Sequence, residues 1–144
     1  MRVAVAAILA LVTGATSASA SQGQTLGFDL LAVLKVAYYP LQVMSYCYKE
    51  VSQNQDFQTA GNEWNRRNSA LLNQIEGKAK AEHISNDLRN AADKETLAAI
   101  QKVVGGQSDK TAYCKLIMSL VDGGQYDLAI RDDLKQPLKR IFPQ

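Results

Sequence analysis

The chain has 144 residues, a length typical of one domain. Its 16 Lys and Arg residues against 14 Asp and Glu residues give a net charge of +2, which argues against a nucleic-acid-binding protein. Apolar residues make up 47% of the chain and charged residues 21%, which excludes a disordered polyelectrolyte.

The N-terminus has the three parts of a secretory signal peptide. Arg2 supplies a positive charge, residues 3–12 form an uninterrupted apolar run, and Ala18-Ser19-Ala20 is the small-residue pattern of a cleavage site. The run is too short for a transmembrane helix, which needs about 20 apolar residues. We therefore expect residues 1–20 to be a cleaved signal peptide and the protein to be periplasmic or secreted.

The rest of the chain reads as one helical domain. Residues 21–27 are small and polar and are expected to be a flexible start to a domain over 28–144. Within that domain apolar residues recur with the period of a helix, and no stretch alternates as a strand does. The pattern predicts an all-α, single-domain bundle of four to five helices.

The first apolar segment covers residues 28–39. It has almost no polar side apart from Lys35, so it is either a buried central helix or an element that docks on a partner or a membrane surface. Pro40 is predicted to kink the helix or to start a new one, because its ring fixes φ and removes a hydrogen-bond donor. The helix after Pro40 places Cys47 on its apolar face.

A heptad pattern dominates the middle of the chain. The seam positions of this pattern are Phe57, Ala60, Trp64, Asn68, Leu71 and Ile75. They predict a bundle helix that begins near Asp56 and continues to about Ala92. Asn68 is the odd residue of the seam, because a buried amide needs hydrogen-bond partners.

Three shorter helices are predicted after that. The first begins at Asp93 and ends at Gly105-Gly106, the second ends at Gly123-Gly124, and the third begins near Tyr126 and is kinked by Pro137. Their expected core positions are Leu97, Ile100, Val103, Val104, Tyr113, Leu116, Ile117, Leu120, Val121, Ile130, Leu134, Leu138 and Ile141.

The two cysteines, Cys47 and Cys114, both border apolar helix faces. An even number of cysteines in an exported chain favours a disulfide, with two buried free thiols as the alternative. Closing a loop of roughly 67 residues would stabilise the fold by about 4 kcal/mol on the chain-entropy estimate. The bond is predicted to link the helix of Cys47 to that of Cys114.

The sequence offers little for catalysis. Motifs of serine hydrolases, phosphate loops and zinc proteases are absent, and His83 lies in a charged stretch typical of a solvated side chain. Haem held by His83 with Met44 or Met118, and a metal held by His83 with Cys47 and Cys114, are less favoured. The first needs a histidine on an apolar face, and the second competes with the disulfide. We expect no enzyme, cofactor or metal site.

Three features favour recognition instead. They are the apolar segment 28–39 with Leu31 and Leu34, the tyrosines around Tyr38-Tyr39, and the Arg66-Arg67 pair beside Trp64. The sequence thus predicts a non-enzymatic protein that binds an envelope or secreted protein. Any contact with a membrane surface or with lipid is predicted to occur through segment 28–39. A carrier of a small apolar ligand or lipid in a cavity between helices is the alternative.

Overall fold

The computed structural model describes residues 16–143, and the surroundings of side chains from residue 25 onward. Its elements are α1 (Thr16–Tyr46), the π-helical η1 (Cys47–Ser52), α2 (Gln55–Ala81), α3 (Asn86–Gly105), α4 (Lys110–Asp122), the 3₁₀ turn η2 (Leu128–Ile130) and α5 (Asp132–Ile141). No strand occurs between residues 16 and 143. The prediction of an all-α bundle with one disulfide is confirmed.

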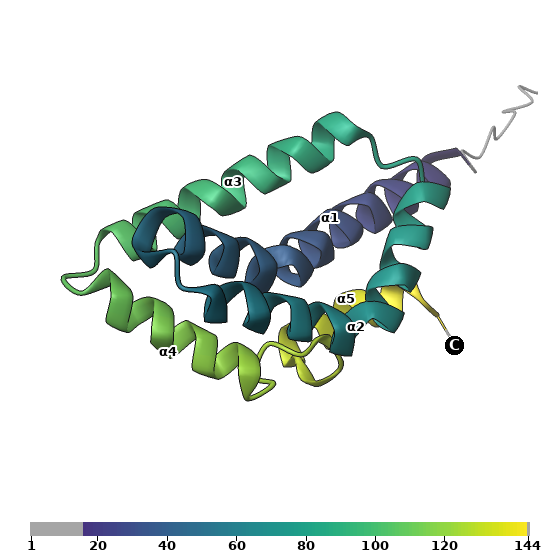
Figure 1. The fold of residues 1–144 in the computed structure, drawn as a ribbon. Helices are drawn as coiled ribbons and strands as arrows, with labels where there is room; N and C mark the ends of the chain where they lie inside the picture. Colours follow the sequence, from purple (N-terminus) through teal and green to yellow (C-terminus); the bar gives the residue numbers. More distant parts are fainter. Residues whose placement is uncertain (1–15, 144) are drawn as a thin grey trace, which may run out of the picture.

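The bundle is arranged around α1, which packs against α2, α3 and α5. Figure 1 shows α3 alone along one side of α1, with α2, α4 and α5 on the other. The core positions of α1 are Leu30, Val33, Leu34, Ala37, Val43, Met44 and, at the start of η1, Cys47. Segment 28–39 is therefore largely part of the core.

The path of α1 differs from the sequence prediction at both ends of this segment. Residues 21–27, expected to be a flexible start, belong to the helix. Pro40 does not restart the helix either, because α1 continues through it to Tyr46. A proline inside a helix costs about 3 kcal/mol. Burial of apolar side chains on both sides of Pro40 compensates for that cost. The expected signal peptide falls mostly on residues 1–15, which lie outside the described residues.

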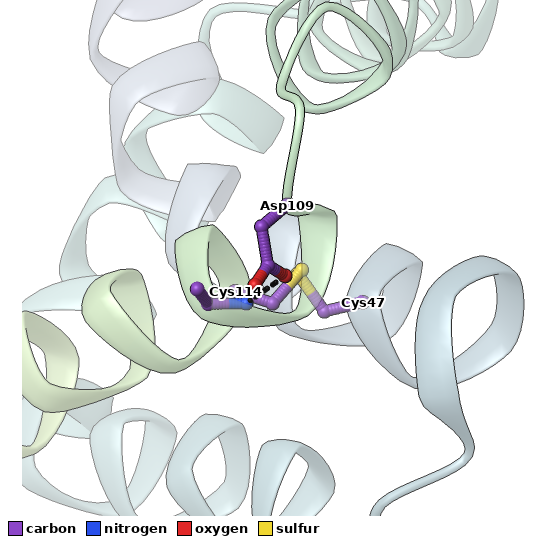
Figure 2. Close-up of a disulfide and its surroundings, with 4 residues drawn as sticks. Cys47, Asp109 and Cys114 are labelled. Carbon is purple, nitrogen blue, oxygen red and sulfur yellow. Dashed lines mark hydrogen bonds between the residues drawn. A yellow bond between two sulfur atoms is a disulfide. The ribbon is translucent and has the colours of Figure 1, made fainter.

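The disulfide forms as predicted between Cys47 and Cys114, with an S–S distance of 2.05 Å. Figure 2 shows how it joins η1 to the first turns of α4, close to the residue that caps that helix. The cap is Asp109, whose carboxylate accepts a hydrogen bond from the backbone N–H of Ala112 at 2.8 Å. Both sulfur atoms belong to fully buried residues, so the bond lies within the core.

The largest error in the predicted helices lies at the turn between α2 and α3. The sequence predicts one helix to about Ala92, but α2 ends at Ala81 and α3 begins at Asn86. His83 takes the left-handed φ of 55°, and the N–H of Ile84 bonds the carbonyl of Ala79 at 3.0 Å. This is the helix-ending motif that usually uses glycine. His83 itself is exposed, as predicted.

Four residues expected in the core face solvent instead. Leu97 and Val103 of α3, Leu116 of α4 and Ile130 of η2 are 41%, 44%, 55% and 63% exposed. On α3 the buried residues are only Thr96, Ile100 and Val104, a strip narrower than the predicted apolar face. The helix touches the bundle along one line, so side chains that flank this line remain accessible.

Candidate functional site

The candidate site lies where α3 meets α1. Because α3 contacts α1 along a narrow line, an open groove runs on each side of that contact. The small side chain of Ala99 leaves room between the helices on one side. Both grooves are open to solvent, so their lining residues can meet a partner.

The first, which we call the glutamine groove, has a volume of about 550 Å³. Its lining residues come from α1, η1 and α3 and are Leu41, Gln42, Ser45, Tyr46, Lys49, Glu50, Asp93, Lys94, Leu97 and Gln101. Gln42 donates a hydrogen bond from Nε2 to Oδ1 of Asp93 at 2.9 Å, while its Oε1 is buried with no hydrogen-bond partner among the described residues. Two lining side chains of the glutamine groove are cationic, Lys49 and Lys94, and two are anionic, Glu50 and Asp93. The net charge of the lining is therefore zero and favours a ligand of neither sign.

The second, the tyrosine groove, has a volume of about 380 Å³. Its lining residues come from α1, α3 and the segment between α4 and α5: Lys35, Val36, Tyr39, Glu95, Thr96, Ala99, Tyr126 and Arg131. The rings of Tyr39 and Tyr126 lie 5.8 Å apart between centroids and are tilted by 32°. The guanidinium carbon of Arg131 lies 5.6 Å from the centre of the Tyr126 ring, a cation–π contact.

Ion pairs hold the polar edge of the tyrosine groove. Arg131 binds Asp133 through two hydrogen bonds of 2.8 and 2.5 Å, which fixes its guanidinium beside Tyr126. Across the α1–α3 contact, Nζ of Lys35 lies 2.8 Å from the carboxylate of Glu95. The groove therefore combines an aromatic floor with charged groups at its rim, an arrangement typical of protein interfaces, which have an aromatic-rich centre and a polar rim.

The tyrosine hydroxyls of this groove remain protonated at physiological pH. Burial raises the pKa of Tyr39 to about 12, and the neighbouring Tyr126 adds to the shift. Burial also raises the pKa of Tyr126, against the opposing effect of Arg131. Among the described residues no group accepts a hydrogen bond from either hydroxyl, so both can donate to a carbonyl or carboxylate of a partner.

The structure separates the tyrosines that the sequence grouped together. Tyr38 does not line the tyrosine groove; it donates a hydrogen bond to Oε1 of Glu76 at 2.6 Å. Tyr38, Leu31 and Leu34 line a small recess of about 40 Å³. Leu34 is only 6% exposed, which makes it a core residue and leaves it little surface for a partner.

The Arg66-Arg67 pair is also divided. Arg66 is exposed and pairs with Glu63 on its own helix, at 2.8 Å. Arg67 binds both carboxylate oxygens of Asp127 at 3.2 Å and the carbonyl of Val121 at 2.7 Å. Arg67 therefore holds the segment between α4 and α5 against α2.

The seam asparagine completes this attachment. Asn68 donates from Nδ2 to Asp127 at 3.0 Å and to the carbonyl of Trp64 at 2.9 Å, and its Oδ1 accepts from the N–H of Leu128 at 2.8 Å. Trp64 donates from Nε1 to the carbonyl of Tyr126 at 2.9 Å. These contacts place Tyr126 and Arg131 beside α1, so Trp64, Arg67 and Asn68 position the tyrosine groove rather than line it.

Sequence reasoning missed most of the tyrosine groove. It selected Tyr39, but Tyr126, Arg131 and Glu95 reach the groove from elements distant in sequence. One usable signal was the Tyr-x₄-Arg spacing of Tyr126 and Arg131 in a segment rich in turn residues, where aromatic and arginine side chains often serve recognition.

Comparison with known proteins places the chain in no family, because no family model, no curated protein and no solved structure matches it. Within residues 25–143 no group of three or more His, Cys, Asp or Glu residues could hold a metal ion. One described segment, Thr25–Ser52, is long and apolar enough to cross a membrane. Its buried side is the core of the bundle, the same property that makes a central helix apolar.

Proposed function

We propose that this protein is an exported, non-enzymatic binding protein that docks a partner protein of the envelope or secreted space in its tyrosine groove. The observation that carries the proposal is the pairing of Tyr39 and Tyr126 with Arg131 in an open groove. Tyrosine and arginine are enriched among the residues that dominate binding energy at protein interfaces.

The groove is also held in place before any partner arrives. Asp133 fixes Arg131, and the Trp64–Asn68 network fixes the backbone around Tyr126. Fixed side chains lose little conformational entropy on binding, which favours affinity. The two unpartnered phenol hydroxyls supply the directional contacts that select a partner.

A carrier of a small apolar ligand is less favoured by this geometry. A pocket that carries a ligand usually encloses most of the ligand's surface. Both grooves beside α3 are open along their length, and the interior between the helices is filled by side chains such as Trp64, Phe57 and Met44.

The proposal is tested by filling the groove without disturbing the core. Ala99 lines the groove and Ala98, its neighbour on α3, does not, although both are exposed. Ala99→Arg places a bulky side chain in the groove, and Ala98→Arg makes the same change outside it. The two variants and the natural protein are used for affinity capture from the native envelope, with bound proteins and lipids identified by mass spectrometry.

We expect a protein that is captured by the natural chain and by Ala98→Arg but lost with Ala99→Arg. Tyr126→Phe should weaken capture less than Ala99→Arg, since it removes one hydroxyl and keeps the ring. A partner retained equally by both arginine variants contradicts the role of the groove. Co-purification of a lipid, without a protein, favours the carrier.

A further inference from the structure

A third surface lies on the opposite side of the bundle from α3, between α2 and α5. It is a groove of about 520 Å³ lined by Leu71, Leu138, Phe142, Lys135 and Lys139. Three of these residues are apolar and two are lysines, and no acidic residue lines the groove. We call it the lysine groove. Its occupant should present an apolar side chain together with negative charge.

The other end of α5 offers that combination. Ile130, just before the helix, is 63% exposed, and the carboxylate side chain of Asp132 is 88% exposed. Asp132 pairs with Lys135 at 2.5 Å, but both side chains are well exposed, so this pair contributes little. Lys139 forms no ion pair with any described residue. Acidic first turns and basic last turns are common in helices. In α5, however, the basic end lies next to the apolar residues of the lysine groove, and the acidic end lies next to the exposed Ile130.

The spacing on α5 makes the helix complementary to itself. Asp132, Lys135 and Lys139 follow at intervals of three and four residues, so they share one face of the helix. If two α5 helices pack antiparallel, with the twofold axis between Lys135 and Gln136, Asp132 of each copy lies beside Lys139 of the other. The two Lys135 side chains approach each other at the axis, where each is paired with Asp132 of its own chain. Ile130 of each copy then lies near the end of the other's lysine groove.

We propose that this face is an interface between two copies of the chain, related by a twofold axis through α5. The contact repeats twice, so each favourable pair counts twice, as in any isologous dimer. A helix of 10 residues is about 15 Å long, so the interface is small and the dimer is in equilibrium with monomer.

A membrane surface suits this face less well. Its apolar residues Leu71, Leu138 and Phe142 are half-buried in a recess, whereas a bilayer meets residues that protrude. Only two lysines line the groove, so its attraction to an anionic bilayer is weak. A second copy offers a protruding isoleucine and a matching carboxylate, which fit a recess.

The test is a charge exchange followed by sedimentation velocity over a range of protein concentrations. Lys139→Glu puts a carboxylate beside Asp132 of the other copy, and Asp132→Lys puts an ammonium group beside Lys139 of the other copy. Because the interface is symmetric, each substitution creates two repulsive contacts, and each single variant should dimerise at least about tenfold more weakly than the natural chain. Mixing the two variants should restore association, because both contacts between positions 132 and 139 in the mixed dimer are again between opposite charges. Lys102→Glu, an exposed lysine on α3, is the matched control and should leave the equilibrium unchanged.

Circular dichroism of each variant checks that the fold is intact, and rescue by mixing can only come from folded chains. A natural chain that remains monomeric up to about 1 mM overturns the proposal, since even weak specific contacts associate there. Dimers that form equally well with each single variant also overturn it. So does a monomer whose binding to phosphatidylglycerol vesicles is lost in Lys139→Glu, because the face would then meet lipid.

Discussion

The two sides of α1 are held in different ways. On the side of α2, α4 and α5, the contacts include the Cys47–Cys114 disulfide, the buried Trp64 and the two hydrogen bonds of 2.6 and 2.7 Å between Arg140 and Asp29. On the side of α3, the contacts are three buried residues, two exposed polar contacts to α1 and one ion pair from Arg89 to Glu76 of α2. Stability is concentrated on the first side, and the second keeps the accessible surface on which the proposed docking depends. We call them the fastened side and the open side.

Among substitutions on the fastened side, we expect the one at Trp64 to lower the stability of the protein most. Trp64→Ala removes the largest fully buried side chain and its hydrogen bond to Tyr126, so the free energy of unfolding should fall by about 3–5 kcal/mol. Chemical denaturation of the purified protein measures this change. Leu116→Ala, on an exposed position of α4, is the control and should change it by less than about 1 kcal/mol. Equal effects would contradict the assignment of Trp64 to the core.

Loss of the disulfide should have the next largest effect. The loop it closes spans 67 residues, and opening it by Cys47→Ala with Cys114→Ala should cost about 2–4 kcal/mol. Because the bond stabilises mainly by restricting the unfolded chain, the helical content of the folded variant should not change. Non-reducing mass analysis of the natural protein should find two fewer hydrogens than in the reduced form; two alkylatable thiols would contradict the bond.

Asn68→Ala tests the network that holds the tyrosine groove. The substitution leaves the N–H of Leu128 without its acceptor, and a buried unsatisfied group costs about 1–3 kcal/mol. Asn73, exposed on the same helix, provides the matched control Asn73→Ala. If the network positions the groove, Asn68→Ala should also weaken partner capture in a protein that remains folded at low temperature. A stability change without any loss of capture separates the network from the groove.

The sequence predicted the features that depend on one helix at a time. Heptad spacing correctly placed Phe57, Trp64 and Ile75 in the core. The position of Cys47 and Cys114 beside apolar helix faces correctly indicated that the two cysteines could form a disulfide. Rules that consider one helix at a time gave wrong predictions where packing between helices determines the structure. Pro40 is tolerated because α1 is packed on both sides, and His83 ends α2 although glycine is the usual residue there. Gly124, with a φ of 79°, ends α4 where the sequence predicted a stop.

The candidate site was harder to predict because three separate elements build it. Tyr39 was predicted as a site residue from the pattern of its own helix. The sequence of residues 126–131, in contrast, does not indicate that hydrogen bonds from Arg67 and Asn68 hold this segment against α2. Likewise, an apolar residue such as Leu97 looks like core by its helical period. Its exposure follows from how few neighbours α3 has, and a single sequence does not contain that information.

On the open side, we expect α3 to separate from α1 more easily than α2 separates from α1. Few buried residues and exposed polar contacts give a helix a low free energy of local opening. We expect the backbone amides of α3 to exchange with solvent faster than those around Trp64 in α2, and at low denaturant concentration to exchange independently of global unfolding. Hydrogen exchange followed by mass spectrometry measures both. Protection of α3 equal to that of α2 would remove the distinction between the two sides.

The smallest expected effect concerns a partly buried ion pair of the fastened side, where Arg140 of α5 binds the buried Asp29 of α1. The hydrogen bonds from Arg140 lower the pKa of the Asp29 carboxyl below its ordinary value of 3.8. A carboxyl whose pKa is lowered by folding stabilises the folded state above the unfolded pKa, and this contribution disappears as pH falls through the folded pKa. Asp29→Asn should therefore lower the melting temperature slightly near neutral pH, and the difference from the natural protein should vanish below the folded-state pKa, where both side chains are uncharged. Asp122→Asn removes an exposed carboxylate at the end of α4 that forms no ion pair with any described residue, and it is the control. A difference between Asp29→Asn and the natural protein that persists unchanged at the lowest pH would show that Asp29 acts through packing rather than through its charge.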